Sequence, residues 1–464
     1  MSLVMKFGGS SVATAQRLTQ VVDLVVAARP RRPAVVLSAM GKSTDALFAA
    51  GEAARNGDVG TATQRIDGVF GVAAQALGEL LAAPAAAQAS LDVMRTDLLT
   101  LLRGVSLLRE LTPRTRDAIV AHGERIATAV FTAALRERDV PVVLIDATDW
   151  LRTDAVHGGA TPLRATIATL AAAAVTPALE AGTVVVTQGY LGGTADGATT
   201  TLGRGGSDWS AALLGEALRA DEVQIWTDVE GVLSADPRIV PEPRPIPVLS
   251  PAEAAELAAF GAKVLHPATI QPAVDAGIPV TVRHTLRPQG AFTTIDPRAT
   301  RSARGTVAAL ACRGPVTVLT MTSTRMLAQS GYLARLFAAF GELGVCVDLV
   351  ATAEVSVTCT VEPDAPLEKL AKALAGHAHI EVATDRAIVA AVGDGLVRAP
   401  QMLARAASAL HPIVPEVTCF GGNDRNLSFV VKQSEVAAAM QRLHAAFFPA
   451  EAGTAAVGNA REVG

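Results

Sequence analysis

Residues that could bind an anion are concentrated in one short segment, residues 199–210, which reads T-T-T-L-G-R-G-G-S-D-W-S. Its three glycines, Gly203, Gly205 and Gly206, allow backbone N–H groups to approach an anion without interference from a Cβ atom. The stretch 211–218 that follows is predicted to be an amphipathic helix, whose positive dipole end would face the loop. The plain alternative for a single segment of this kind is a flexible glycine turn that caps a helix.

The side chains of the same segment add charge and hydrogen bonds. Arg204 carries a planar guanidinium, which can bind a carboxylate or a phosphate through two parallel hydrogen bonds. Asp208 can orient cations around the bound anion, and Ser207 can supply a neutral hydrogen bond. The segment therefore predicts a binding site for an anionic substrate.

A second anion-binding pattern lies at the N-terminus, where a short apolar strand carries Lys6 and runs into Gly8 and Gly9. This order predicts an anion cradle with the lysine directed into it. The pattern is not a P-loop, because the spacing G-x-x-x-x-G-K-[S/T] is absent. The tempting G-K-S at residues 41–43 has Val36 where the first glycine should be.

A helix is expected directly after this Gly-Gly turn. Ser10 or Ser11 is its expected N-cap, since a hydroxyl can accept a hydrogen bond from the free N–H groups of the first turn. Its apolar face is expected to comprise Val12, Ala15, Leu18, Val22, Val25 and Val26.

Valine-rich apolar runs recur along the first part of the chain and are continuous rather than alternating. Such runs are typical of parallel strands covered on both faces. The predicted strands are residues 3–7, 34–39, 141–146, 182–188, 222–227 and 278–284. Residues 43–138 are rich in alanine and leucine and are predicted to form a helical lobe that lines the substrate site. Residues 283–304, with several prolines and glycines, are predicted to be a linker.

Length and composition fit a soluble, cytoplasmic enzyme. The 464 residues suffice for two or three domains with their own cores. A net charge of −4 and the lack of a basic stripe exclude a nucleic-acid partner. No apolar run is long enough for a membrane span, and Lys6 interrupts the N-terminal run too early for a secretory signal. The four cysteines show no C-x-x-C spacing, so free thiols in a reducing cytoplasm are expected.

The remainder of the chain contains an internal repeat of about 70 residues with the order βαββαβ. The first copy is predicted as strand 315–322, helix 331–343, a hairpin of 346–352 and 354–362, a further helix, and strand 379–384. The second copy is predicted as strand 387–392, helix 401–410, strands 415–421 and 427–431, and helix 434–448. Two ferredoxin-like domains of this kind could bind a small ligand or could merely hold a dimer together.

Taken together, these segments resemble the aspartokinases of the amino acid kinase superfamily. The motifs occur in the family's order: K-F-G-G-S-S-V at 6–12, L-S-A-M-G-K at 37–42, H-G-E at 122–124, T-T-T-L-G-R-G-G-S-D at 199–208, W-T-D-V at 226–229 and F-G-A-K-V-L-H-P at 260–267. The repeat resembles a pair of ACT domains, the amino-acid-sensing modules of aspartokinases. The resemblance implies an α/β amino acid kinase fold, a mainly parallel sheet with helices on both faces, followed by two ferredoxin-like ACT domains.

The implied domain boundaries follow from the motifs and the repeat. The catalytic domain is expected at residues 1–288 and the linker at 289–304. The first ACT domain is expected at 305–384, with its strand 305–312 pairing with the second ACT domain at 385–449. Residues 450–464 would be a C-terminal tail.

The resemblance implies that ATP phosphorylates the β-carboxylate of L-aspartate, with Mg²⁺ bridging phosphate oxygens. The attacking carboxylate is ionised at neutral pH, so no general base is needed. The protein would hold two anions in line and stabilise the charge on the transferred group. Lys6 and Lys263 would flank the phosphates, with Asp208 organising both lysines.

The remaining implied site residues divide between the two substrates. Arg204 would bind the α-carboxylate of aspartate and Glu124 its ammonium group. Ser38, Thr44 and Ser207 would add neutral hydrogen bonds. The implied nucleotide site comprises Lys6, Gly8, Gly9, Ser10, Thr227, Asp228, Leu233, Arg238 and Lys263.

The first ACT copy resembles that of lysine-sensitive aspartokinases. Backbone N–H groups around Gly331 and Tyr332 could bind the α-carboxylate of an amino acid, and Asp348 and Glu354 could bind the ammonium groups of lysine. The implied effector site comprises Met326, Gln329, Gly331, Tyr332, Leu333, Val347, Asp348, Thr352 and Glu354. Because ACT modules commonly pair across subunits, at least a homodimer is implied.

Several positions depart from the family pattern. Asp45 stands where asparagine is common and adds negative charge near an anionic substrate, and Leu233 stands where relatives often have an aromatic residue. Gln329, Cys346 and Ala353 occupy positions that are often serine in lysine-sensitive relatives, so threonine stays open as an effector.

Two other functions fit parts of the pattern. Another amino acid kinase, acting on glutamate, acetylglutamate or UMP, would share most motifs, although acetylglutamate lacks the free ammonium that Glu124 would bind. An inactive kinase fold that only senses amino acids is the second alternative. It is disfavoured because every charged position that the chemistry needs is filled.

Overall fold

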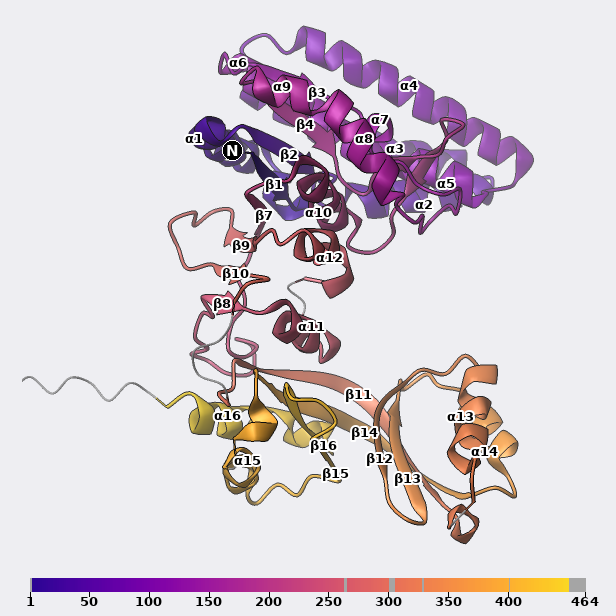
Figure 1. The fold of residues 1–464 in the computed structure, drawn as a ribbon. Coiled ribbons are helices and arrows are strands. Elements are labelled where there is room, and N and C mark those ends of the chain that lie inside the picture. Colours follow the sequence, from indigo (N-terminus) through magenta and orange to yellow (C-terminus); the bar gives the residue numbers. More distant parts are fainter. Residues whose placement is uncertain (1, 263–264, 300–304, 328, 400, 450–464) are drawn as a thin grey trace, which may run out of the picture. The chain divides into compact units, whose positions relative to one another are not determined.

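The computed structural model describes residues 2–262, 265–299, 305–327, 329–399 and 401–449. Their contacts divide the chain into two compact units (Figure 1). The first unit comprises Met1–Val232, Pro245–Ala258 and Lys263–Thr300, and the second comprises Leu233–Arg244, Ala259–Ala262 and Arg301–Gly464. The segment Leu233–Arg244 thus belongs to the second unit, although the resemblance implies a place in the catalytic domain.

An eight-stranded sheet forms the centre of the first unit, in the order β3-β4-β2-β1-β7-β9-β10-β8. All neighbours pair in parallel except β9 and β10. Every residue of β1, β2 and β4 is buried, so the centre of the sheet is covered on both faces. The six predicted strands and the predicted fold class are confirmed. The strands are β1 Leu3–Phe7, β2 Pro33–Leu37, β3 Val142–Leu144, β4 Val184–Gln188, β7 Glu222–Thr227, β8 Val248–Leu249, β9 Val280–His284 and β10 Thr293–Ile295.

Helices and a short hairpin complete this unit. The predicted helical lobe at residues 43–138 is present as α2 to α6. The helices are α1 Ala15–Ala28, α2 Ser43–Arg55, α3 Val59–Leu80, α4 Ala85–Leu108, α5 Pro113–Val120, α6 His122–Glu137, α7 Ala147–Trp150, α8 Arg164–Ala174, α9 Thr176–Glu180, α10 Gly206–Leu218, α11 Pro251–Ala259 and α12 Pro267–Asp275. The hairpin pairs β5 Leu191–Gly193 with β6 Thr199–Thr201.

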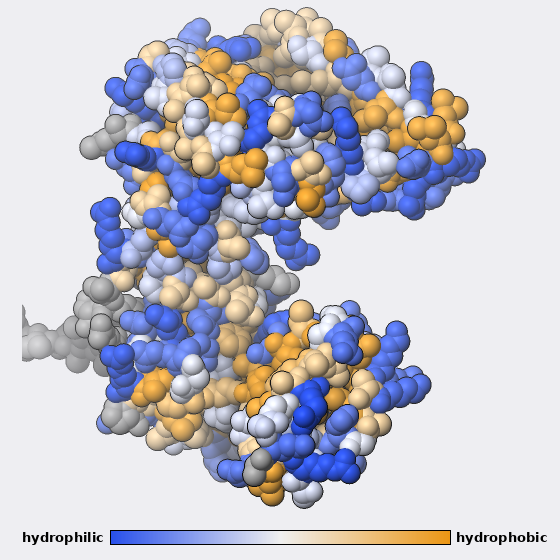
Figure 2. Space-filling model, turned by 45° about the vertical axis from the view of Figure 1, so that its right-hand side comes forward, coloured by the Kyte–Doolittle hydropathy of each residue, from blue (hydrophilic) through white to orange (hydrophobic). Residues whose placement is uncertain are grey.

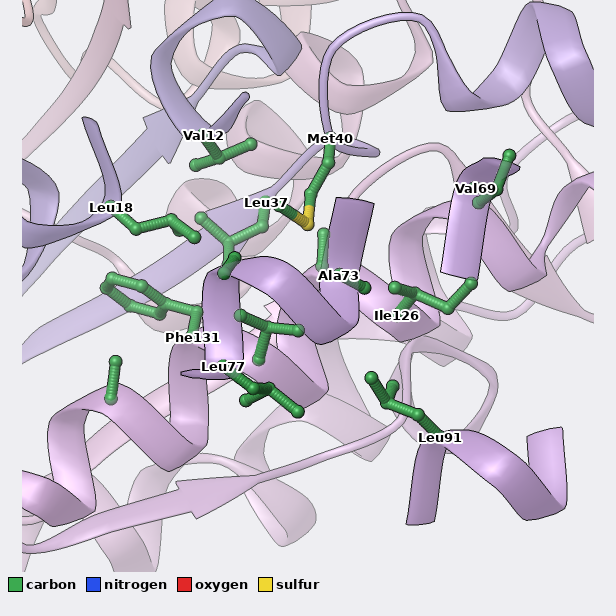
Figure 3. Packing of buried hydrophobic residues seen from close by; sticks show 14 of the residues in the cluster. Val12, Leu18, Leu37, Met40, Val69, Ala73, Leu77, Leu91, Ile126 and Phe131 are labelled. Carbon is green, nitrogen blue, oxygen red and sulfur yellow. The ribbon is translucent and has the colours of Figure 1, made fainter. Parts of the chain in front are cut away.

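The main core of this unit lies between the sheet and the lobe. Figure 3 shows Leu37 of β2, Leu18 of α1 and Phe131 of α6, which belong to one buried cluster together with side chains of α3 and α4. Burial of such side chains is the main force that holds the lobe on the sheet.

Two local expectations at the N-terminus are wrong. Thr14, rather than Ser10 or Ser11, caps α1, because its hydroxyl accepts a hydrogen bond from the Arg17 N–H. A short 3₁₀ turn, Gly9–Val12, precedes it and shifts the helix start. Val26 is exposed rather than part of the apolar face.

The linker expected at residues 283–304 is also wrong in part. Residues Val280–His284 complete β9, and Thr293–Ile295 form β10 within the sheet. The strand β10 pairs with both β9 and β8. Three residues are too short for a clear periodic signal, so sequence patterning does not reveal this strand.

The second unit contains a six-stranded antiparallel sheet, ordered β12-β13-β11-β14-β16-β15. The elements of both predicted repeats are present. They are β11 Ala309–Thr322, α13 Tyr332–Glu342, β12 Val347–Thr352, β13 Ser356–Val361, α14 Leu367–Leu374, β14 His379–Val392, α15 Met402–Leu410, β15 Val417–Phe420, β16 Asn426–Lys432 and α16 Val436–Phe447.

The two repeats share their central strands. The strands predicted at 379–384 and 387–392 form one continuous strand, β14, and β11 likewise begins at Ala309 instead of residue 315. Ala309 pairs with Val392, so the start of the first copy pairs with the second copy, as expected. The repeats are therefore two halves of one sheet.

The surface of the described residues is mixed in polarity, and one apolar stretch has the length of a membrane span. On the face seen in Figure 2, hydrophilic and hydrophobic residues are interspersed over each unit. Among the described residues, one stretch, Pro113–Glu137, meets the length and hydropathy of a membrane span, but 72% of its most apolar window is buried inside the protein, as in a core helix. All four cysteines are free, as expected.

Candidate active site

A cavity of about 660 Å³ opens in the first unit, beside the segments that follow β1, β2 and β4. The carboxyl ends of parallel strands are the usual place for a ligand in an open α/β sheet. The cavity brings together eight residues that the sequence predicted for the site: Lys6, Gly9, Ser38, Thr44, Glu124, Arg204, Ser207 and Asp208.

The glycine-rich loop, residues 203–206, forms one wall of this cavity. Gly203 and Gly205 have φ angles of 78° and 73°, which side chains with a Cβ rarely adopt. Gly206 begins α10, earlier than predicted, and a Cβ atom there would lie 2.7 Å from the Tyr190 ring. Ser207 and Asp208 therefore lie in the first turn of the helix, and Arg204 precedes it.

Lys6 and Asp208 form an ion pair inside the cavity. The Lys6 Nζ lies 2.6 Å from Asp208 Oδ1, and the two side chains are only 11% and 16% exposed. The carboxylate thus holds the ammonium group in place where a bound anion would meet it. This is the contact expected for Asp208. Lys263, the other lysine that Asp208 was expected to organise, lies outside the described residues.

Glu124 supplies a buried carboxyl group from the first turn of α6. It is 3% exposed, and its Oε1 accepts a hydrogen bond of 3.2 Å from the Ala39 N–H. Its Oε2 is buried and has no hydrogen-bond partner among the described residues. Burial raises the pKa of Glu124 to about 8, outweighing the hydrogen bond from Ala39. The cavity therefore contains an acidic group that lacks a cation.

The backbone of the N-terminal turn is only partly available for an anion. The Gly8 N–H donates to the Trp226 carbonyl at 3.1 Å, so the expectation that it donates to a phosphate is wrong for this structure. Gly9 lines the cavity, and a Cβ atom there would lie 2.7 Å from the Ala39 carbonyl oxygen. Ser10 is outside the cavity lining, and its carbonyl accepts a hydrogen bond from the Arg17 guanidinium.

The remaining predicted nucleotide residues do not line this cavity. Thr227 ends β7, and its hydroxyl donates to Asp228 at 3.2 Å. Leu233 and Arg238 belong to the second unit, where the Arg238 guanidinium pairs with Asp236 at 2.5 Å. Their role in nucleotide binding stays a prediction.

Sequence reasoning missed several side chains of the cavity wall. Phe48 of α2 and Tyr190, just beyond β4, line it, and so does Asp45, whose role the sequence left open. Tyr190 has a φ angle of 67°, which is an uncommon backbone conformation for a bulky residue. Residues in such conformations are found preferentially at functional sites. Its position after a buried parallel strand is the signal that could have indicated it.

The predicted effector residues all lie in the second unit, in and around α13 and the hairpin β12–β13. Gly331 is the N-cap of α13, with a φ angle of 75° and open space where a Cβ would be. The Tyr332 hydroxyl donates to the His377 carbonyl at 2.5 Å. Met326 packs against the core of this half, and Leu333 is exposed. Gln329 precedes α13, while Val347 and Thr352 begin and end β12.

One of the two acidic effector residues is already paired. Asp348 Oδ1 lies 2.8 Å from Arg313, so the expectation that this carboxylate is free for a ligand is wrong in this structure. Burial nevertheless raises the pKa of Asp348, despite the opposing effect of Arg313. Glu354 is exposed in the turn between β12 and β13 and has no partner among the described residues.

Comparison with known proteins defines the class of this fold and site. Residues 1–284 match the amino acid kinase family, and residues 389–447 match an ACT domain. The chain is 36% identical to aspartokinase 1 of Arabidopsis thaliana, with 97% of this chain and 80% of the relative covered. It is also 36% identical to the lysine-sensitive aspartokinase 3 of Escherichia coli, with 96% and 99% covered.

Solved structures lead to the same group. E. coli aspartokinase III in complex with lysine and aspartate superimposes with a TM-score of 0.80 at 35% identity, covering 96% of this chain and 99% of that one. The same enzyme with aspartate and ADP also gives 0.80 at 35% identity, covering 97% and 100%. The chain belongs to the aspartokinases, within the amino acid kinase family. It is an aspartate kinase, as the motifs had implied.

Proposed function

We propose that the cavity between the glycine-rich loop and α6 binds L-aspartate and that the γ-phosphoryl group of ATP is transferred there to its β-carboxylate. The observation that carries this proposal is the charge pattern of the wall. Arg204 is a cation and Glu124 is an acid, and neither has an oppositely charged partner among the described residues, which matches the α-carboxylate and the ammonium group of an amino acid. Lys6, paired with Asp208, adds a second cation for the reacting anions.

In this proposal each group has one electrostatic task. Arg204, with no partner among the described residues, binds the α-carboxylate through its planar fork. Glu124 binds the ammonium group. Lys6, held by Asp208, stabilises the negative charge that spreads over the phosphoryl group in the transition state. Ser38, Thr44 and Ser207 line the cavity and supply neutral hydrogen bonds; Lys263, by resemblance, faces the phosphates.

Magnesium is proposed to arrive with the nucleotide. Among the described residues no group of three or more His, Cys, Asp or Glu side chains could hold a metal ion by itself. Mg²⁺ in kinase sites usually keeps several waters and is held by substrate phosphates with one or two protein carboxylates, so it does not need a cage of three or more protein ligands. The ion supplies charge neutralisation between the phosphates, while Lys6 and Gly9 contact the anion from the protein side.

Replacement of Arg204 by alanine is expected to raise the KM for aspartate about 100-fold or more and to leave the KM for ATP within about twofold. The reason is that one substrate carboxylate would lose a charged, two-point partner inside the cavity. Initial-rate kinetics with each substrate varied separately measures both constants. Arg219→Ala, which removes an exposed arginine at the far end of α10, is the matched control. A selective rise of the KM for ATP would reverse the assignment of this wall.

We further propose that L-lysine inhibits the enzyme by binding near α13 and the hairpin β12–β13, with residues 326–354 of a second subunit completing the site. Support comes from the open space beside Gly331 at the N-terminus of α13 and from Glu354, which has no partner among the described residues. The Tyr332 N–H donates to the Gln329 carbonyl at 3.4 Å, so an effector carboxylate would have to replace this long hydrogen bond. An ammonium group of lysine would have to displace Arg313 from Asp348, and this competition lowers the apparent affinity for lysine. The subunits would then form a homodimer or a larger oligomer.

Lysine is expected to bind in calorimetry, and threonine and methionine are expected not to bind. Glu354→Ala should weaken lysine inhibition about tenfold or more, because one effector ammonium would lose its carboxylate. Asp364→Ala, which removes another exposed carboxylate of this unit, should leave inhibition unchanged. Coupling between two ligands is reciprocal. Aspartate together with a non-hydrolysable ATP analogue must therefore weaken lysine binding by the same factor as lysine weakens the binding of these two ligands. Threonine binding with no lysine binding would overturn the effector assignment.

The proposed domain limits remain those of the sequence, residues 1–288 and 305–449, with two changes. The strand β10 belongs to the catalytic sheet, and the segments Leu233–Arg244 and Ala259–Ala262 belong to the second unit. A cytoplasmic location is proposed from the four free cysteines.

A further inference from the structure

Asp117 is a buried carboxylate with no part in the proposed reaction. It lies in α5, is 1% exposed and does not line the cavity. Three donors surround it. Thr201 Oγ1 donates to Oδ1 at 2.7 Å, while His157 Nδ1 and the Gly158 N–H donate to Oδ2 at 2.8 and 3.0 Å. A carboxylate is costly to bury, and this one is satisfied on both oxygens.

The donors belong to two segments that build the same wall of the cavity. Gly158 itself lines the cavity, and Thr201 ends β6 two residues before the glycine-rich loop. The segments also touch each other. The Ala160 N–H donates to the Thr201 carbonyl at 2.8 Å, and a Cβ atom on Gly203 would lie 3.6 Å from the Gly158 carbonyl oxygen. Asp117 is therefore connected, through Gly158 and Thr201, to Gly203, which directly precedes Arg204 in the chain.

The wall itself has little means of fixing its own shape. Gly158, Gly203 and Gly205 all have positive φ angles, and glycine is the residue with the most backbone freedom to lose on ordering. A side chain that bridges the two segments from behind can supply the order that the loop lacks.

We propose that Asp117 is a positioning residue for aspartate binding: it holds the 157–158 turn and Thr201 together and thereby keeps Arg204 in place at the cavity wall. The inference rests on the proposed assignment of this cavity to aspartate. Small displacements of a positioning group are costly, since a misplacement of about 1 Å can reduce a reaction rate about 100-fold. The competing explanation is that Asp117 only stabilises the fold.

The test compares Asp117→Ala with Asp117→Asn. The asparagine keeps the shape, one acceptor for His157 and Gly158, and a donor that can reach the Thr201 hydroxyl, so it should restore function. Asp117→Ala should raise the KM for aspartate about tenfold or more and leave the KM for ATP within about twofold. Asp117→Asn should have a KM for aspartate close to that of the wild type. Asp58→Ala, which removes a helix-capping carboxylate that is not part of the lining of this cavity, should leave both constants unchanged.

A purely structural residue would give a different pattern. A lower folded fraction would reduce the apparent kcat and leave both KM values unchanged, and a loosened domain would raise both KM values together. Either pattern overturns the proposal. If Asp117→Ala fails to fold, His157→Ala and His157→Asn decide, because His157 directly precedes Gly158, which lines the cavity, and the asparagine Nδ2 can replace the ring Nδ1 as the donor to Asp117. An unchanged KM for aspartate in His157→Ala, with Thr201→Val equally without effect, would then overturn it.

Failure of this inference and failure of the proposed function are distinguishable. Where Arg204→Ala raises the KM for aspartate and Asp117→Ala does not, the positioning role is wrong and the aspartate site stands. Where neither variant changes that KM, the cavity is not the aspartate site.

Discussion

Replacing Lys6 with alanine or methionine is expected to lower kcat by about 100- to 1,000-fold, with much smaller changes in both KM values. The reason is that the ammonium group stabilises negative charge that develops mainly in the transition state. Loss of one such group raises the activation free energy by about 3–4 kcal/mol. The ion pair of 2.6 Å with Asp208 fixes the ammonium before the substrates bind, so its stabilisation needs no rearrangement. Steady-state and single-turnover kinetics measure the effect on the chemical step.

Methionine is the sharper of the two substitutions. It fills the space of the lysine stem in the buried strand β1 and removes only the charge. The matched control is Lys42→Met, since Lys42 lies in the rejected G-K-S pattern, is exposed and does not line the cavity. Near-normal turnover of a folded Lys6→Met enzyme would remove Lys6 from catalysis.

The KM for aspartate is expected to fall about tenfold for each pH unit from pH 6 towards pH 8 and then to level off. The pKa of Glu124 is raised from 4.5 to about 8 by burial, so below pH 8 most of the free enzyme carries the neutral acid. The substrate ammonium requires the ionised form, and the apparent affinity is reduced by the fraction of enzyme that is competent. Aspartate binding near pH 7 should therefore release a proton, which calorimetry in buffers of different ionisation enthalpy measures.

The variant Glu124→Gln is expected to remove this pH dependence and to raise the KM for aspartate at pH 8 by about 100- to 1,000-fold. The substrate ammonium would be buried beside an uncharged amide, and an unpaired buried charge costs about 3–5 kcal/mol. The control is Glu52→Gln, which removes a partly buried carboxylate that pairs with Arg55 and Arg116 away from the cavity. A pH-independent KM in the wild-type enzyme would contradict the assignment of Glu124.

The titration of Glu124 also affects the stability of the folded protein. Aspartate affinity is expected to rise with pH, whereas the stability contributed by Glu124 is expected to fall. Between pH 4.5 and about 8 the unfolded chain has lost the Glu124 proton, whereas the folded chain retains it. The free energy of unfolding contributed by this group therefore falls as pH rises through that window. The ligand-free Glu124→Gln protein should gain stability relative to the wild type as the pH is raised to 8, which denaturant titrations at several pH values test.

Much of the fold could be predicted from the sequence because its signals are local. Short apolar runs identify buried parallel strands such as β1 and β7, whose predicted bounds are the observed ones. The glycine-rich loop and the lysine before Gly-Gly likewise identify two walls of the cavity, since positive φ angles and anion binding restrict the residue types. Short elements such as β10 carry too few residues for periodicity to show.

Local sequence patterns are sufficient to indicate the class of fold, the kinase motifs and the charged residues that a phosphoryl transfer would need. The contacts of those residues depend on how the chain folds. Burial in the folded protein, and not the residue type, raises the pKa of Glu124, and the Gly8 N–H is lost to a neighbouring strand. The group of Asp117, His157 and Thr201 joins segments 40 to 84 residues apart. Hydrogen-bond partners and desolvation depend on such distant contacts, and local sequence patterns do not contain them.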